Sequence, residues 1–294
     1  QNTDDFDVLK DAVNKLHLND PSFVSEPEAH EALGRGFRCG FLGVLHSEII
    51  AERIQREFSV PLVISRPSVE FSVTDKKGKE LSIKTAVDWP DPTQIESIKE
   101  PWAQVEVITP ASFYPKALQL LEQIEGTQKD IVYLSEKTVQ LVYEAPLREI
   151  IIDFNDKLKS VTQGMASMDY EIIDMREGDL VKLEVLIAGE IQEAFSKVVP
   201  KVSAYQEGKT LVAKLKEVLP AQQFSVALQA VVGGKVLARE TIGSRRRDVT
   251  ASLYGGDVTR KNKLLDKQKK GKKELKAKGR VIIPPKVFLD VFRS

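Results

Sequence analysis

The chain is poor in the residues that build covalent cross-links, metal centres and general bases. Its 294 residues include one cysteine, Cys39, and three scattered histidines, His17, His30 and His46. A single cysteine cannot form an internal disulfide, and a zinc site normally needs several Cys or His ligands. These scarcities argue against a disulfide-stabilised secreted domain and favour a reducing compartment.

Long hydrophobic runs are also missing, and we expect no signal peptide within this sequence. No apolar stretch approaches the roughly 18 residues of a membrane-spanning helix, and Gln1-Asn2-Thr3-Asp4-Asp5 shows no signal-peptide pattern. Hydrophobic residues make up 42% of the chain and charged residues 29%. This balance is that of a globular protein and excludes collagen-like, coiled-coil and wholly disordered chains. At about 100–200 residues per domain, the length predicts two or three domains.

No catalytic constellation is visible. Gly233-Gly234-Lys235-Val236 lacks both the loop and the hydroxyl of a phosphate-binding Gly-x-x-x-x-Gly-Lys-Ser/Thr motif. Cys39 has no obvious base, and for His46 a structural role and an RNA contact both stay open. Gly34-Arg35-Gly36 is interpreted as a turn between strands, with phosphate binding as the alternative. The sequence therefore predicts no active site within this chain.

The charge of the chain is strongly segregated, although its net charge is zero. Residues 1–234 carry 25 basic and 37 acidic side chains, a net charge of −12, whereas residues 235–294 carry 18 basic and 6 acidic side chains, a net charge of +12. The densest stretch, residues 260–280, has 11 basic and 2 acidic residues. A solvated tail and a segment that binds a polyanion, either nucleic acid or an anionic membrane, are both compatible with this pattern.

The first segment has the order helix-strand-strand-helix-strand. Phe6, Leu9, Val13 and Leu16 form one apolar stripe of a first helix. A second helix is expected over residues 44–58, with Leu45, Ile49, Ile50, Ile54 and Phe58 facing inward. The strands are expected at residues 22–26, 37–43 and 62–73.

A complete unit follows in the middle of the chain. Its elements are expected to be a strand over 102–108, a helix opened by Pro115, a hairpin of 131–134 and 139–143, a helix from Pro146 to Leu158, and a strand over 165–173. This βαββαβ order is the ferredoxin-like split βαβ unit. The first segment has the same order without its opening strand. We therefore expect the chain to be the C-terminal piece of a longer protein.

The last third combines a hairpin with a basic helix. Strands are expected at residues 181–187 and 249–253, a short helix at 211–218, and a hairpin of 224–232 and 235–242 that turns at Gly233-Gly234. Residues 260–278 predict a helix with only Leu264, Leu265 and Leu275 as large apolar side chains. So thin a stripe packs weakly, and we expect this helix to be frayed or disordered alone and to become ordered on a polyanionic partner.

The predicted fold class is α+β. It comprises two ferredoxin-like βαββαβ split-βαβ domains, of which the first lacks its opening strand, and an α+β C-terminal domain with a basic helix. The expected division is residues 1–75, a linker or β-arm over 76–99, residues 100–174, and residues 175–294.

Three motifs then point to a family. Residues 37–50, Phe-Arg-Cys-Gly-Phe-Leu-Gly-Val-Leu-His-Ser-Glu-Ile-Ile, closely resemble a motif of the LepA family of translational GTPases, the elongation factor 4 family. Residues 254–269, which begin Tyr-Gly-Gly-Asp-Val-Thr-Arg-Lys, resemble the signature of its C-terminal domain, and residues 157–167 are similar to the end of its domain V. The chain departs from the family at Val199–Val202, where only Lys201 is basic, and at Glu207, where the family has a basic residue.

The resemblance implies domain III, domain V and the family's own C-terminal domain. The GTPase domain and domain II would precede Gln1, so GTP and Mg²⁺ are implied there and no cofactor is expected here. It also implies a monomer that binds the ribosome, 23S-type rRNA and tRNA in GTP-dependent back-translocation or ribosome assembly. Bacterial cytoplasm is expected, with peripheral attachment to its membrane and an organelle matrix as open alternatives.

The residues expected to contact RNA phosphates are basic side chains of the last third. Lys and Arg supply sequence-independent affinity for phosphates, and structured RNA is recognised largely by shape and backbone. The expected contact residues, none of them catalytic, are Arg245, Arg246, Arg247, Arg260, Lys261, Lys263, Lys267, Lys269, Lys270, Lys272 and Lys273. The alternative is peripheral binding of residues 260–280 to an anionic membrane, worth ~1 kcal/mol per cation. That segment lacks the Trp-, Phe- and Leu-rich face of an interfacial helix.

Overall fold

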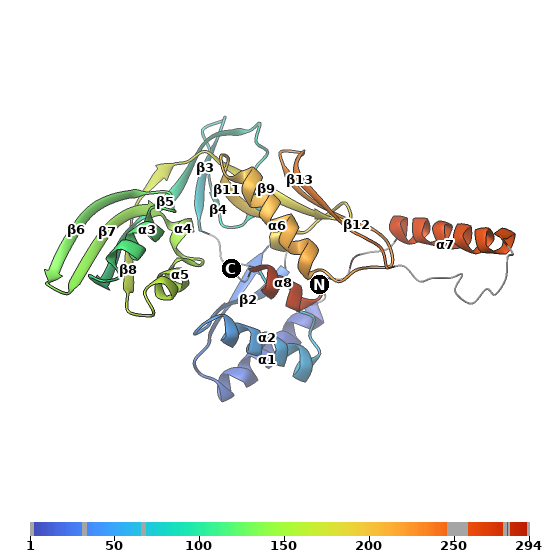
Figure 1. Ribbon diagram of the computed structural model, residues 1–294, viewed down its shortest axis with the longest axis horizontal. Helices are drawn as coiled ribbons and strands as arrows, with labels where there is room; N and C mark the ends of the chain where they lie inside the picture. The colour runs from blue at the N-terminus through green and yellow to red at the C-terminus, as the bar shows by residue number, and fades with distance from the viewer. Residues whose placement is uncertain are drawn as a thin grey trace. The chain divides into compact units, whose positions relative to one another are not determined.

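The computed structural model describes residues 3–30, 34–65, 69–245, 258–278, 281 and 283–292 (Figure 1). Its mixture of helices and antiparallel sheets confirms the α+β class. Two compact units divide the chain: residues 1–65 together with 181–293, and residues 66–180. The domain boundaries expected at residues 75, 99 and 174 stay predictions.

The N-terminal segment has the expected order helix-strand-strand-helix. α1 (Thr3–Asn19) is followed by the antiparallel pair β1 (Val24–His30) and β2 (Gly34–Gly40), and then by α2 (Val44–Phe58). The two helices and the hairpin bury one cluster, which comprises Ala12, Val13, Leu16, Phe23, Ile50, Ile54 and Val60. The α1 stripe predicted from the sequence therefore faces this core.

Three details of this segment differ from expectation. Gly34 and Gly36 pair with His30 and Glu28 inside the β1–β2 ladder, so they belong to a strand and not to a turn. Leu45 and Ile49 are 66% and 48% exposed, because they lie about 140° and 100° around the helix from the buried Ile50. Within the described chain, residues 59–65 belong to no strand, and the strand expected over 62–73 is assigned only from Phe71.

The unit of residues 66–180 contains the predicted ferredoxin-like arrangement. Its core elements are β5 (Ile95–Pro110), α3 (Tyr114–Leu121), β6 (Thr127–Ser135), β7 (Thr138–Pro146), α5 (Phe154–Val161) and β8 (Ser167–Glu177). The strands pair antiparallel in the order β8–β5–β7–β6, which is the split βαβ pattern. α3 and α5 contact each other and cover one face, where alternate β5 residues Ala103, Val105 and Val107 are buried (Figure 1).

Two details of this unit refine the expectation, which had a strand over 62–73, a linker or β-arm over 76–99 and one helix from Pro146 to Leu158. β3 (Phe71–Asp75) and β4 (Glu80–Ile83) form a hairpin that joins the first part of β5, ahead of the short helix η1 (Ala86–Asp88) in the connection to β5. The single helix expected from Pro146 to Leu158 is divided into α4 (Leu147–Ile150) and α5. The pattern of apolar residues continues across this break, so it concealed the division.

The sheet of the last third is formed by β9 (Leu180–Ile187), β10 (Glu190–Ile191), β12 (Val226–Val232) and β13 (Lys235–Ile242), with β11 (Lys197–Pro200) also paired to β9. The short helix η2 (Glu193–Phe195) precedes β11, and α6 (Ala204–Val218), longer than expected, packs on β12 and β13. Gly233 and Gly234 have φ values of 54° and 79°. Two positive φ angles are the requirement of a type I′ hairpin turn, so the predicted Gly-Gly hairpin is confirmed.

The chain then forms α7 (Val258–Lys278) and α8 (Pro285–Phe292). α8 was not predicted. Its Val287, Phe288 and Val291 are buried, and the Phe288 ring stacks on Phe195 with centroids 4.9 Å apart. The strand expected over residues 249–253 lies outside the described residues. None of the described helices is long and apolar enough to cross a bilayer.

Candidate nucleic-acid interface

α7 contains eight of the eleven residues expected to contact phosphates. It runs without interruption past Gly271, although a central glycine costs about 1 kcal/mol relative to alanine. Lys, Arg, Leu and Gln, which are good helix formers, occupy most of its other positions. The predicted basic helix is therefore confirmed, whereas its ordering on a partner stays a prediction.

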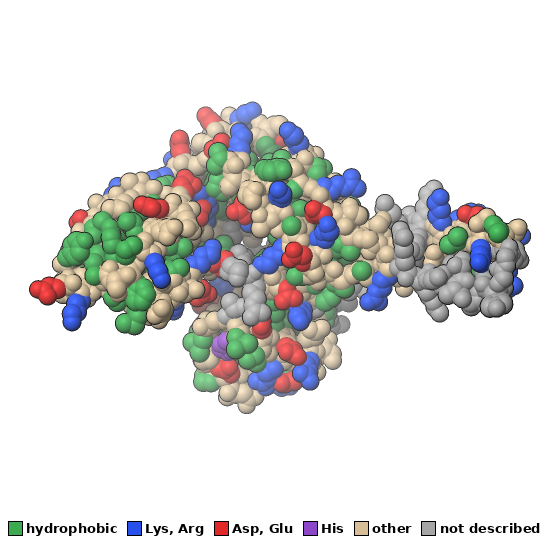
Figure 2. Space-filling model, in the orientation of Figure 1, with side chains coloured by type: hydrophobic (Ala, Val, Ile, Leu, Met, Phe, Trp, Pro, Cys, Tyr) green, Lys and Arg blue, Asp and Glu red, His purple; other side chains and the backbone are tan. Residues whose placement is uncertain are grey.

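Four cations of α7 form a row along one face. Arg260, Lys263, Lys267 and Lys270 follow one another at spacings of three, four and three residues, so they lie within about 80° of the helix circumference. All four side chains are exposed, and Figure 2 shows Lys and Arg side chains on the described surface of this helix. At about 1.5 Å per residue, the row is roughly 15 Å long. We call these four residues the cationic row.

The other predicted residues are placed differently. Lys261 is half-buried on the side of Leu264, and Lys269 is exposed on the face about 180° from Arg260. Arg245 is exposed just after β13, where its backbone N–H donates to the Gln222 carbonyl at 2.8 Å. The side chains of Lys272 and Lys273, like all of Arg246 and Arg247, lie outside the described residues.

Within the described part of the chain, no ion pair neutralises the lysine side chains of this row. Elsewhere in the same unit Lys216 pairs with Glu240 at 2.7 Å, and Lys197 pairs with Glu207. Among the residues that the structure describes, no ion pair involves Lys263, Lys267 or Lys270. Their ammonium groups are thus available to phosphates, which such exposed cations bind mainly through charge.

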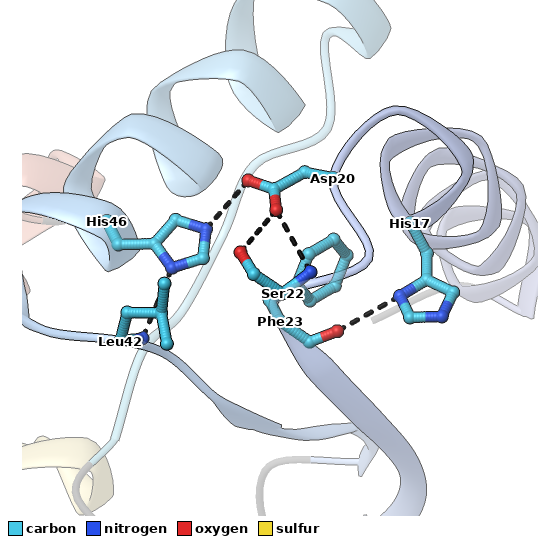
Figure 3. Close-up of polar contacts among 6 residues, drawn as sticks. All are labelled: His17, Asp20, Ser22, Phe23, Leu42 and His46. Carbon is cyan, nitrogen blue, oxygen red and sulfur yellow. Dashed lines mark hydrogen bonds and ion pairs between the residues drawn. The ribbon is translucent and has the colours of Figure 1, made fainter.

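A second polar cluster, around His46, has a structural role (Figure 3). The Leu42 N–H donates to His46 Nδ1 at 3.2 Å, and the opposite ring nitrogen, Nε2, lies 2.9 Å from Asp20 Oδ2. Because Nδ1 accepts a hydrogen bond, Nε2 carries the proton and donates it to Asp20. The ring therefore ties the start of α2 to the loop after α1.

The chemistry of this cluster does not fit a catalytic triad. The Ser22 hydroxyl donates to Asp20 rather than to His46, and the Ser22 N–H donates to the same carboxylate oxygen at 3.1 Å. The hydrogen bonds from Ser22, followed by that from His46, hold the pKa of Asp20 below its usual range. With no free nitrogen lone pair, His46 cannot serve as a general base in this arrangement.

The candidate nucleophile Cys39 and the side chain of His17 are also accounted for. Burial raises the pKa of the Cys39 thiol, which disfavours the reactive thiolate. His17 Nδ1 donates to the Phe23 carbonyl at 3.0 Å (Figure 3). Among the described residues, no group of three or more His, Cys, Asp or Glu side chains is arranged to hold a metal ion.

Two protein families match consecutive parts of this chain. Residues 97–186 match the family described as Elongation factor G C-terminus, and residues 187–293 match GTP-binding protein LepA C-terminus. Proteins named elongation factor 4 are 49% identical to this chain over 292 residues in Thermus thermophilus and 48% identical over 291 residues in Wolinella succinogenes. The chain resembles the C-terminal portion of elongation factor 4.

The likeness extends over nearly the whole chain. The two alignments cover 99% of its residues but only 48% and 49% of the relatives, so the chain spans about half the length of the curated relatives it matches. A relative from Solibacter usitatus is 48% identical over 286 residues. The family resemblance expected from the three sequence motifs is confirmed.

Proposed function

We propose that this chain is the ribosome- and RNA-binding part of a translation factor of the elongation factor 4 type. The observation that supports the proposal is the cationic row, whose four exposed side chains follow one face of α7. Basic side chains in a row of about 15 Å can contact several phosphates of one folded RNA without reading its sequence. rRNA and the acceptor arm of tRNA are the RNA partners that we propose.

The remaining phosphate contacts come from the other predicted basic residues. Arg245 is exposed, and Lys269 presents charge on a second face of α7. Together with the four side chains of the cationic row, they give about six cations for a complex that would engage ~6–8 phosphates. None of these residues has a chemical step to perform, so binding and orientation are their whole contribution.

GTP hydrolysis is proposed only for the longer proteins that this chain resembles. The sequence contains no phosphate-binding loop, and within the described residues no group of three or more His, Cys, Asp or Glu side chains could hold a metal ion. Back-translocation or a part in ribosome assembly would belong to the whole factor, with this half holding the RNA.

The experiment is a salt titration of tRNA binding to the intact chain. Release of counterions predicts that the logarithm of the affinity falls linearly with the logarithm of the salt concentration, with a slope of about −4 to −7. A flat response would contradict the proposal. GTP turnover by this chain alone would contradict the assignment of hydrolysis elsewhere.

Liposomes separate the RNA proposal from membrane binding. Among the described side chains of α7, Val258 and Leu265 are the exposed large apolar residues, and they do not form a broad apolar face. We expect tRNA to displace the chain from anionic vesicles in a co-sedimentation assay. Vesicle binding that persists at saturating tRNA would favour the membrane function instead.

A further inference from the structure

β8 is an outer strand of the sheet in the unit of residues 66–180. It pairs antiparallel with β5 from Lys99 to Ile108, and β5 is its only strand partner within the described chain (Figure 1). The Tyr170 N–H donates to the Asp169 side chain at 2.9 Å. This backbone donor therefore faces the open edge of β8, where a side chain satisfies it in place of another strand.

This edge is neither short nor interrupted by Pro, two of the devices that keep edges from pairing. Native edge strands are commonly short or carry Lys or Pro, whereas β8 has eleven residues and neither Lys nor Pro. Its apolar side chains are prominent: Tyr170 is 44% exposed, Ile172 57% and Met175 43%. A bulge at Ile172–Asp174 is the one irregularity in its pairing with β5. Such a strand can accept a partner through its backbone groups.

The charge of β8 selects the kind of partner. Its acidic residues are Asp169, Glu171, Asp174 and Glu177, and Arg176 is its one base, which leaves a net charge of −3. Arg176 is already engaged by Asp174 and by Glu144, whereas no ion pair within the described residues involves Glu171 or Glu177. RNA would be repelled here, and a second copy paired edge to edge would bring carboxylates together.

We propose that the open edge of β8 binds an extended, basic segment of another protein, which adds to the sheet as a further strand. The backbone groups along the edge would supply hydrogen bonds, with Asp169 releasing the Tyr170 N–H to the incoming strand. Lys or Arg side chains of the partner would face Glu171, and its apolar side chains would cover Tyr170 and Ile172 on the other face. This interaction is independent of the cationic row and does not rest on the proposed RNA function.

The test uses the full chain and three synthetic probes. The first is a capped nine-residue peptide that alternates Lys with Val; the second has Glu in place of every Lys; the third has Pro in place of two central Val residues. Hydrogen–deuterium exchange read by mass spectrometry follows the amides of β8 and of β6, the opposite edge. We expect the Lys-Val peptide to slow exchange in residues 167–177 and to leave residues 127–135 unchanged. The Glu and Pro peptides should protect neither.

Two variants and a matched control sharpen the result. Glu171→Lys should weaken binding of the Lys-Val peptide about three- to tenfold, because it replaces attraction by repulsion at an exposed position. Glu136→Lys, in the exposed turn between β6 and β7, makes the same change in net charge and should leave affinity unaltered. Tyr170→Pro removes the edge donor without removing a ladder bond and should abolish binding. If that variant fails to fold, the comparison of Glu171→Lys with Glu136→Lys alone tests the proposal.

Three outcomes would overturn the proposal. They are equal affinity of the Lys-Val peptide for the Glu171→Lys and Glu136→Lys variants, protection confined to β6, and equal protection by the Pro peptide. Protection of β8 that depends on the concentration of the chain itself, without peptide, would show that a second copy is the occupant. Glu171→Lys leaves the cationic row intact, so failure here is distinguishable from failure to bind RNA.

Discussion

A buried carboxylate gives the unit of residues 66–180 a pH-dependent stability. Glu100 on β5 is 1% exposed, and it accepts a hydrogen bond from Arg148 Nη1 at 2.8 Å. Arg148 is shared with Glu125 and lies 3.7 Å from Glu149. Burial raises the pKa of Glu100 to about 7; Arg148 opposes this shift, and the charges of Glu125 and Glu149 add to it.

The sign of the effect follows from where the proton is held. The unfolded chain releases the Glu100 proton near its ordinary pKa of 4.5, whereas the folded chain keeps it until about pH 7. The folded state therefore binds more protons between these values, and stability falls as the pH rises through them. Each pH unit costs up to about 1.4 kcal/mol, which gives a loss of about 3 kcal/mol in all and no further loss above pH 7.

Tryptophan fluorescence can measure this loss selectively. The chain has two tryptophans, Trp89 and Trp102, and both belong to this unit. Urea unfolding followed by their emission at pH 5, 6, 7 and 8 should show the decline in wild type. Glu100→Gln removes the titration and should flatten the profile. Asp75, whose pKa is lowered chiefly by a hydrogen bond from the Lys79 N–H, contributes only at more acidic pH.

The reasoning is refuted by either of two results. One is a wild-type unfolding free energy that stays constant or rises from pH 5 to pH 7. The other is a decline of equal slope in the Glu100→Gln variant, which would assign the titration to another group. The absolute stability of the variant does not decide the matter, because loss of the carboxylate also changes the environment of Arg148.

Three further predictions test other parts of the fold. Phe288→Ala should lower the free energy of unfolding, measured by thermal unfolding, by about 3–5 kcal/mol. The control Lys286→Ala, at an exposed position of the same helix, should lower it by less than about 0.5 kcal/mol. Equal effects of the two substitutions would contradict the packing of α8 in the core. Gly271→Ala should stabilise α7 by about 0.5–1 kcal/mol and deepen circular dichroism at 222 nm, whereas a shallower signal would contradict a continuous helix. His46→Ala should cost about 1–2 kcal/mol and speed amide exchange at residues 42–46, and unchanged exchange there would count against its structural role.

The local patterns of the sequence predicted much of this fold because they are strong and short-range. Apolar periodicity placed α2 at its observed bounds, and Gly233-Gly234 identified a hairpin because only a few residues accept two positive φ angles. The split βαβ order was predicted from the sequence of strand-like and helix-like apolar patterns along residues 102–173. The resemblance to a family came from contiguous motifs and not from the periodicity.

What the sequence concealed depends on tertiary contacts. Leu45 and Ile49 were expected inside because they are apolar, yet their angular positions place them away from the Ile50–Ile54 side of α2. The apolar residues of α8 follow a long basic stretch, so a helix that returns to the core was overlooked. For the candidate interface, composition identified the basic residues, but only helical geometry separated Arg260, Lys263, Lys267 and Lys270 from Lys261 and Lys269. The spacing of Arg260, Lys263, Lys267 and Lys270 by three, four and three residues can be read directly from the sequence.

The most direct test of the central claim is the salt dependence of tRNA binding by a charge-removing variant of the cationic row. Lys263→Ala, Lys267→Ala and Lys270→Ala together remove three exposed charges while keeping good helix formers in α7. Lys76→Ala, Lys77→Ala and Lys79→Ala remove three exposed charges from the β3–β4 turn as a matched control. The account predicts that the first variant reduces the magnitude of the log–log slope by about 2 to 3 and that the control leaves it unchanged. Equal slopes in both variants would contradict it.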